Sequence, residues 1–221
     1  MDNFFLHRLA QENCQLTDFE RLVNVYHLAA QVLAYRVPGS FVELGCNAGL
    51  TSVMLQRLIG ADDPSRELHV YDSFAGLPEP GPLDRYLSRG DCASTRAELE
   101  ANFRRWEQPC PVVHPGWLEQ TLPECLPPSI AFAYIDVDFH DATQCALDHV
   151  YPRMSEGGII CVDDYCDHAR NERAWPGLPG VRIAVDEFFN GKPERNVVLA
   201  GQGDLAFCFI RKQSAATVAA Q

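Results

Sequence analysis

The sequence predicts an α/β fold in which a mostly parallel sheet carries helices on both faces. Short apolar runs typical of strands alternate with amphipathic stretches typical of helices along most of the chain. A glycine-containing turn follows the first expected strand, and pairs of aspartates follow two later ones. Ligands of such folds bind outside the carboxyl ends of the strands, so we expect the turn and the aspartates to meet there.

The order of the elements can be predicted along the chain. Residues 17–36 should form a helix that opens with a capping box at Thr17 and Glu20 and ends before Pro38. Residues 75–93 are rich in Gly and Pro and should form a long surface loop. The other strands are expected at 40–44, 67–71, 111–114, 130–135 and 157–162, the other helices at 50–59, 94–106, 141–150 and 181–189, and a closing antiparallel hairpin at 196–200 and 205–210.

Composition limits the class of protein. Residues 1–221 should form one domain, with a helical lead-in at 1–38 and a disordered tail at 212–221. Neither an apolar run long enough to cross a membrane nor a signal-peptide pattern is present, so we expect a cytoplasmic protein without a membrane partner. A formal charge of -12 disfavours nucleic acid as a partner. Nine scattered cysteines without a CxxC pair indicate neither a disulfide framework nor a zinc cluster.

The glycine turn is the first candidate ligand site. Gly45 and Gly49 lie between the first strand and the next helix, where glycine lets the backbone approach a ligand closely. Their spacing differs from the GxGxxG of dinucleotide sites. Asp72, at the end of the second strand, can accept hydrogen bonds from both hydroxyls of a ribose, and Glu43 would attract an ammonium and repel phosphate. These residues suit an adenosine with a short polar tail, unless the glycines only allow a tight turn and Asp72 is a solvated strand end.

Four carboxylates form the second candidate site. Asp136 and Asp138 follow the strand at 130–135 and stand two residues apart, hence on the same side of the chain. Asp163 and Asp164 follow the next strand. If the two strands are neighbours, the four carboxylates converge, and a divalent ion with oxygen ligands would offset their repulsion. We expect Mg²⁺, with Mn²⁺ or Ca²⁺ as alternatives; the competing interpretation is that these aspartates only cap helices.

Such a site supports in-line attack of an oxygen on a sulfonium methyl group. We assign Asp136, Asp163 and Asp164 to the metal and Asp138 to the general base, with His140 as the second candidate for that role. Phe188 and Phe189, by contrast, are expected in the core.

Several longer motifs extend the comparison to a known family. With them, the chain resembles the macrocin O-methyltransferase (TylF-like) family of bacterial natural-product enzymes, which methylate sugar hydroxyls. The matching segments are Phe41-Val-Glu-Leu-Gly-Cys46, Tyr71-Asp-Ser-Phe-Ala-Gly-Leu-Pro78, Gly116-Trp-Leu-Glu-Gln-Thr-Leu-Pro123, Ile135-Asp-Val-Asp138, Gly157-Gly-Ile-Ile-Cys-Val-Asp-Asp-Tyr165 and Ala184-Val-Asp-Glu-Phe-Phe189.

The resemblance implies a class I, Rossmann-like methyltransferase fold with a seven-stranded sheet whose last strand is antiparallel. It implies a small hydroxylated acceptor, such as the sugar of a glycoside, and a homo-oligomer, with a dimer favoured. It also implies Mg²⁺ at the three assigned aspartates and S-adenosylmethionine at the turn. The candidate contacts of S-adenosylmethionine are Glu43, Gly45, Asn47, Gly49, Asp72 and Ser73.

Two departures from the family and three alternative functions remain at this stage. The family usually has Tyr where His140 stands, and many members carry a longer N-terminal extension that helps enclose the acceptor. The segment 166–180 also looks longer than usual and is expected to act as a substrate lid. The alternatives are a catechol or vicinal-diol O-methyltransferase, a nicotinamide-dependent oxidoreductase, and a non-catalytic module that binds S-adenosylmethionine. The oxidoreductase should carry GxGxxG, which this sequence lacks.

Overall fold

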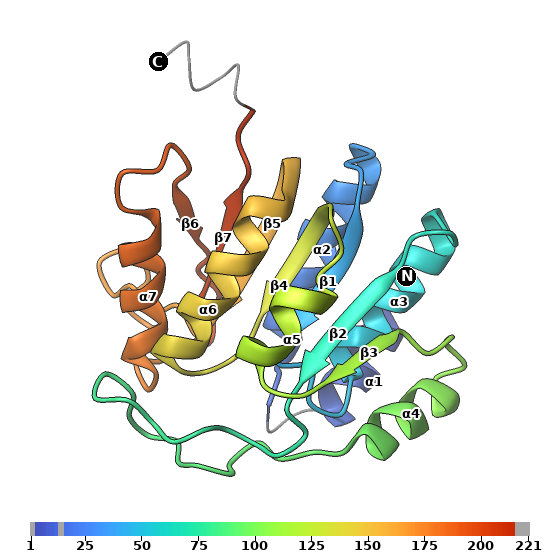
Figure 1. Cartoon of the computed structure of the whole chain (residues 1–221), viewed down its shortest axis with the longest axis horizontal. Helices are drawn as coiled ribbons and strands as arrows, with labels where there is room; N and C mark the ends of the chain where they lie inside the picture. The colour runs from blue at the N-terminus through green and yellow to red at the C-terminus, as the bar shows by residue number, and fades with distance from the viewer. Residues whose placement is uncertain (1–2, 13–15, 215–221) are drawn as a thin grey trace.

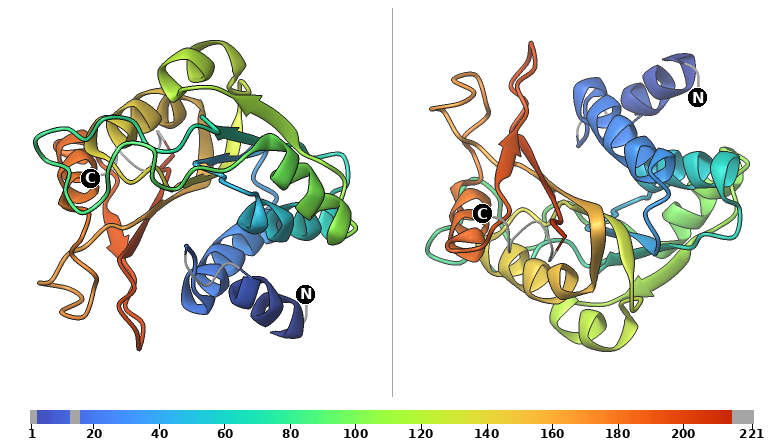
Figure 2. Two further views of the ribbon diagram at one scale, coloured as in Figure 1. Left: turned by 90° about the horizontal axis from the view of Figure 1, so that it is seen from below. Right: turned by 90° about the horizontal axis from the view of Figure 1, so that it is seen from above.

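The computed structural model describes residues 3–12 and 16–214, which build a seven-stranded sheet between two layers of helices (Figures 1 and 2). The strand order is β3-β2-β1-β4-β5-β7-β6. Neighbouring strands are parallel except at β7, which runs antiparallel to both β5 and β6. The α/β class, the antiparallel last strand and the closing hairpin are therefore confirmed. The strands are β1 (Ser40–Leu44), β2 (Leu68–Asp72), β3 (Val112–Pro115), β4 (Ile130–Ile135), β5 (Met154–Asp163), β6 (Asn196–Val198) and β7 (Phe207–Arg211).

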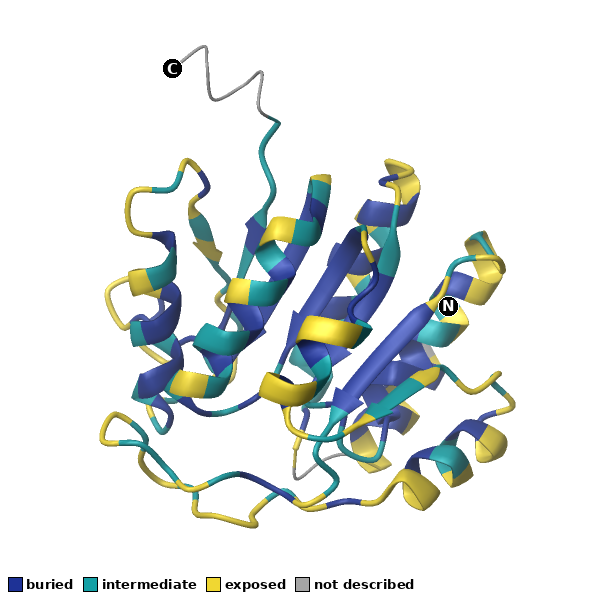
Figure 3. Ribbon diagram, viewed as in Figure 1, coloured by how far each residue is buried: buried dark blue, intermediate teal, exposed yellow. Residues whose placement is uncertain are grey.

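Two hydrophobic clusters separate the helices into layers. The first packs α1 to α4 against one face of the sheet, and the second packs α5 to α7 against the other. The central strands are therefore buried on both faces, as their continuous apolar runs predict (Figure 3). The helices are α1 (Asn3–Glu12), α2 (Phe19–Ala34), α3 (Leu50–Asp62), α4 (Arg96–Arg105), α5 (Leu118–Cys125), α6 (His140–Val150) and α7 (Pro179–Phe189), with a 3₁₀ turn at Tyr151–Arg153.

The start of α2 corrects one prediction. Its N-cap is Asp18, whose carboxylate accepts a hydrogen bond from the backbone N–H of Arg21 at 2.7 Å, so the capping box expected at Thr17 and Glu20 is wrong. Glu20 instead accepts hydrogen bonds from two backbone N–H groups of the loop at 202–203. That loop is far away in the sequence, and it offers the Glu20 carboxylate two donors where a capping box offers one.

Helix α5 was not predicted, and α1 lies within the helical lead-in expected at 1–38, for which no separate bounds were predicted. In α5 a proline at position 123 and the preceding Gly116 indicate a break, although the apolar residues Leu118 and Leu122 have helical spacing and are buried. Strand β5 also begins three residues earlier than expected, because Met154 pairs with Ile130 at the start of β4.

The ends of the described chain bear on two further expectations. The tail predicted at 212–221 is ordered at its first residue, because Lys212 exchanges backbone hydrogen bonds of 2.8 and 2.9 Å with Gly158 and Gly157; residues 215–221 lie outside the described residues. In the described ranges no helix combines the length and the apolar character that a membrane span requires. The eight cysteines described there are all free thiols.

Candidate active site

A pocket opens at the carboxyl edge of the sheet, where β1, β2, β4 and β5 end. It is lined both by the residues expected to bind S-adenosylmethionine and by Asp136, Asp138 and Asp164. Leu16, Thr17 and Trp117, which sequence reasoning missed, complete the wall. The pocket thus joins the two candidate sites that the sequence predicts separately. The expected cofactor residues on its wall are Glu43, Gly45, Asn47, Gly49, Asp72 and Ser73.

Gly45 and Gly49 shape the turn between β1 and α3. Both have positive φ, 83° and 76°, which glycine adopts without strain. A Cβ at Gly45 would lie 1.8 Å from the backbone oxygen of Asp136, so no side chain fits where the turn passes the end of β4. Gly49 is the N-cap of α3, and its neighbours Leu50 and Thr51 line the pocket at the positive end of the helix dipole.

Asp72 and Asn47 hold this turn together. The carboxylate of Asp72 accepts hydrogen bonds from the backbone N–H groups of Asn47 at 2.7 Å and Phe74 at 2.8 Å. Burial raises the pKa of Asp72 despite these bonds. Each carboxylate oxygen keeps acceptor capacity for a ligand hydroxyl. The Asn47 amide donates to the backbone oxygen of Cys92 at 2.7 Å, which fixes the turn to the 75–93 loop.

Glu43 and Ser73 flank the turn. Glu43 is 1% exposed and accepts a short hydrogen bond from the Ser52 hydroxyl. Burial, and to a smaller extent the charge of Asp72, raise the pKa of Glu43 to about 8. A cationic ligand group nearby would favour its ionised form. The Ser73 hydroxyl donates to the backbone oxygen of Gly76 at 2.8 Å.

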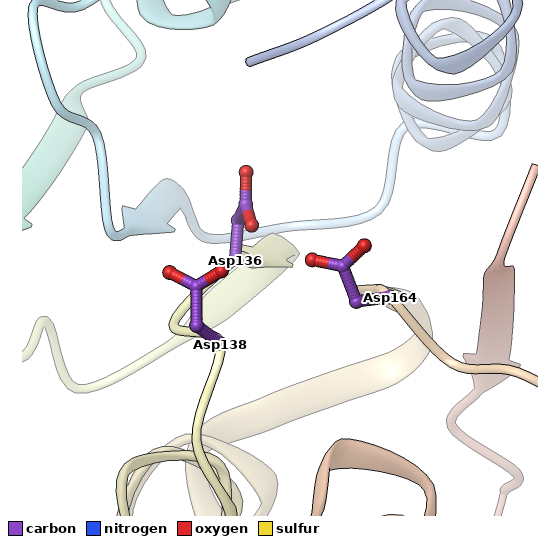
Figure 4. Close-up of side chains that lie close together, drawn as sticks. All are labelled: Asp136, Asp138 and Asp164. Atoms are coloured by element: carbon purple, nitrogen blue, oxygen red, sulfur yellow. The ribbon is translucent and has the colours of Figure 1, made fainter. Parts of the chain in front are cut away.

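Three of the four predicted carboxylates come together. Asp136, Asp138 and Asp164 each place one oxygen within 4.8 Å of the others, where β4 and β5 end (Figure 4). Burial, followed by the charges of the neighbouring aspartates, raises the pKa of Asp136 and Asp164 well above the ordinary value. Burial and the charges of Asp163 and Asp72 raise the pKa of Asp138 to about 7. Asp138 and Asp164 have positive φ, 63° and 58°, which is backbone strain of the kind found at functional sites.

Asp163 neither belongs to this group nor lines the pocket. It is 3% exposed, and one of its oxygens accepts a hydrogen bond from Arg21 Nε at 2.8 Å while the other accepts one from the Tyr134 hydroxyl at 2.6 Å. Arg21 Nη2 also reaches Asp164 at 3.2 Å. The charge of Asp163 is the main reason that the pKa of Arg21 lies above its ordinary value. Tyr134 could have been found from its spacing of two from Asp136 on one strand face, whereas no pattern links Arg21 to residues 163 and 164.

The structure does not bring His140 into the group formed by Asp136, Asp138 and Asp164. This residue begins α6, and its ring nitrogens contact Asp141 at 2.8 Å and Glu187 at 3.3 Å. Burial lowers the pKa of His140, but these carboxylate contacts raise it by more. Its part as a base stays a prediction.

The residues present suit both expected ligands. Carboxylate oxygens are the donors that hard divalent ions such as Mg²⁺ take in proteins, and three of them face one another here. The close approach of Gly45 to β4 leaves the pocket wall free of side chains at the turn. Asp72 remains able to accept hydrogen bonds from a ribose there.

Comparison with known proteins identifies the family. The model of the macrocin O-methyltransferase (TylF) family matches residues 12–187. The 8-demethyl-8-(2,3-dimethoxy-α-L-rhamnosyl)-tetracenomycin-C 4'-O-methyltransferase of Streptomyces olivaceus is 33% identical over 185 residues, which are 78% of this chain and 71% of that protein. The mycinamicin III 3''-O-methyltransferase of Micromonospora griseorubida is 31% identical over 76% of this chain and 67% of its own length.

A solved structure agrees with these relatives. The O-methyltransferase NovP superposes with a TM-score of 0.75 at 25% identity, over 89% of this chain and 81% of NovP. No relative supports the oxidoreductase alternative among those compared. The chain belongs to the macrocin O-methyltransferase family and is an S-adenosylmethionine-dependent O-methyltransferase.

Proposed function

We propose that this protein transfers a methyl group from S-adenosylmethionine to a sugar hydroxyl of a natural-product glycoside, with the help of a divalent ion, Mg²⁺ by default. One observation carries the proposal: three carboxylates converge in the pocket that the glycine turn also lines. This arrangement suits a hydroxyl that must lose a proton beside a methyl donor. The names of the relatives, which methylate a rhamnosyl-tetracenomycin and mycinamicin III, support a glycoside as the acceptor.

Different residues of the pocket would bind the methyl donor and remove the proton from the acceptor. Asp72 and the turn at Gly45 would hold the adenosyl end of the methyl donor, and Glu43 would pair with its cationic tail. Asp138 would accept the proton of the hydroxyl, because its pKa of about 7 lies near a neutral working pH. Fixing the acceptor in line with the methyl group supplies much of the rate enhancement in such transfers.

Asp136 and Asp164, both on the pocket wall, would hold the ion together with Asp163. When bound, the ion supplies a positive charge that lowers the pKa of a nearby hydroxyl. Asp163 now binds Arg21 and Tyr134, so we propose that it exchanges its contact with Arg21 when the ion enters.

Calorimetric titration of S-adenosylmethionine into the protein, with Mg²⁺ and then with EDTA, is the first test. A methyl-transfer screen should follow, with methyl α-L-rhamnopyranoside, desmethyl glycosides and catechols as acceptors. Transfer to a glycoside that EDTA abolishes is the expected result. Transfer to catechols alone would show that the acceptor is a catechol and not a glycoside. Undiminished transfer in EDTA would show that the reaction needs no metal.

The assembly and the location are proposed on weaker grounds, the family resemblance and the composition. We propose a cytoplasmic homo-oligomer, with a dimer favoured. Light scattering coupled to gel filtration measures the mass directly, and a mass of 24.7 kDa would show a monomer instead.

A further inference from the structure

An exposed tyrosine stands at the tip of the 75–93 loop. Tyr86 is 75% exposed and has a φ of 75°, a strained value for a bulky residue. The loop is nevertheless anchored on both sides of it. Asp84 accepts hydrogen bonds from the backbone N–H groups of His140 at 2.8 Å and Gly81 at 3.0 Å, and Leu87 packs against the core beneath α6 and α7. The fold thus holds an aromatic ring out in solvent at the expense of backbone strain.

A second aromatic ring meets the first from another loop. Trp175 lies in the 166–180 segment, and its ring stands edge-on to that of Tyr86, with centroids 4.9 Å apart and planes at 82°. The backbone N–H of Trp175 donates to the backbone oxygen of Asp204 at 2.8 Å, which holds the main chain at Trp175 in place. Gly177 packs directly against this indole, because a Cβ there would lie 2.0 Å from Cζ2. The two rings thus stand nearly at right angles and form a corner, in which a third ring could meet the face of one and the edge of the other.

The two loops that carry these rings are connected to the part of the fold that bears the carboxylates. Asp84 binds the backbone of His140, two residues after Asp138, and the segment that carries Trp175 leaves β5 directly after Asp164. The 75–93 loop is therefore tied to the start of α6, just after the turn that follows β4, and the 166–180 segment begins at the turn that follows β5. Figure 1 shows the 75–93 loop passing below the strand ends towards α6 and α7.

We infer that Tyr86 and Trp175 form a stacking wall for a flat aromatic ring attached to the acceptor sugar. The inference rests on the proposed function and specifies its substrate as an aryl glycoside. Aromatic rings attract one another in face-to-face offset and in edge-to-face geometry, and this corner presents both. An aromatic aglycone seated there would leave its sugar on the side of Asp138, because Asp84, two residues before Tyr86, binds the backbone of His140, two residues after Asp138.

The test compares two glycosides of one sugar, 4-nitrophenyl and methyl α-L-rhamnopyranoside. Equilibrium dialysis with S-adenosylmethionine and Mg²⁺ present measures their binding, and methyl transfer measures their KM. We expect the aryl glycoside to bind about ten-fold more tightly, and Tyr86→Ala or Trp175→Ala to remove most of that difference. Gly177→Ala, which displaces the indole without deleting it, should act in the same direction.

Tyr35→Ala is the matched control, because Tyr35 is 73% exposed but follows α2 at the opposite edge of the sheet. It should keep the full preference, and each variant should keep the wild-type affinity for S-adenosylmethionine if it is folded. Equal binding of the two glycosides to the wild type, or a preference that survives Trp175→Ala, overturns the wall. Absence of binding and transfer for both glycosides overturns the rhamnoside acceptor itself, and the wall with it.

Discussion

Arg21 makes the most consequential contact between the N-terminal helices and the site. Its side chain is 12% exposed and forms ion pairs of 2.8 Å with Asp163, 2% exposed, and 3.2 Å with Asp164, 12% exposed. Arg21→Met keeps the bulk of the side chain but leaves two carboxylates without their cation. Removing one partner of a buried ion pair costs about 3–5 kcal/mol, because the remaining charge is poorly solvated.

Thermal unfolding in EDTA at pH 7.5 measures this cost. For a chain of this length the expected loss corresponds to a melting temperature lower by about 10 °C. Saturating Mg²⁺ should restore much of it, since an ion at one hundred times its Kd adds about 2.7 kcal/mol and offsets the same charges. The deficit should also shrink near pH 5, because burial raises the pKa of Asp164 well above its ordinary value and this carboxylate can then take up a proton.

The control is Arg96→Met, which breaks an ion pair of the same 2.8 Å length with Glu100 at the surface, where the side chains are 55% and 36% exposed. This change should cost less than about 1 kcal/mol. If Arg21→Met unfolds within 1 kcal/mol of the wild type in EDTA, the buried-charge reasoning is refuted. A large loss that Mg²⁺ does not relieve would show that the ion binds elsewhere.

Three further predictions follow from the site. Asp138→Asn should lower kcat at least about 100-fold in a methyl-transfer assay while calorimetry shows nearly unchanged affinity for S-adenosylmethionine; normal turnover would move the role of base to His140 or solvent. Gly45→Ala should abolish binding of S-adenosylmethionine in the same calorimeter, because the added Cβ would lie 1.8 Å from the backbone oxygen of Asp136 and displace the turn. Retained binding would contradict the proposal that this turn holds the methyl donor. The pKa values of about 7 for Asp138 and about 8 for Glu43 lie above the ordinary values near 4, so the folded protein binds more protons than the unfolded chain. In EDTA its melting temperature should therefore fall as the pH rises from about 5 to 8, and Mg²⁺ should reduce that fall. A melting temperature that rises over this range would contradict the raised pKa values.

Local patterns were sufficient to predict the sheet and the turn. Continuous apolar runs predict buried parallel strands, and the structure has β1 and β4 side by side at the centre of the sheet. Gly45 was predicted from its place between a strand and a helix, and its contact with the end of β4 supplies the physical reason for glycine there. Asp136 and Asp138, two residues apart just after β4, were predicted to share a side, and their carboxylates do lie together.

The same rule of alternation separates Asp163 from Asp164. Consecutive residues at a strand end point in opposite directions, so two adjacent aspartates could not both face the pocket in the way that Asp136 and Asp138 do. Asp163 is the last residue of β5 and turns inward to Arg21, whereas Asp164 begins the next turn with a φ of 58° and lines the pocket. The partner of Asp163 was beyond prediction because 142 residues separate it from Arg21.

The balance of charge explains why this fold tolerates so costly a cluster. Four carboxylates lie at these strand ends, and Arg21 forms ion pairs with only two of them, Asp163 and Asp164. Burial, followed by the charges of the neighbouring aspartates, raises the pKa values of Asp136, Asp138 and Asp164. A fold selected for stability alone would replace such a group with apolar side chains, since doing so is often neutral or stabilising. The strained backbone at Asp138 and Asp164 adds to the cost. Binding of the cationic methyl donor, and of the divalent ion proposed above, would relieve this repulsion, so the free energy lost in folding would be recovered as binding free energy.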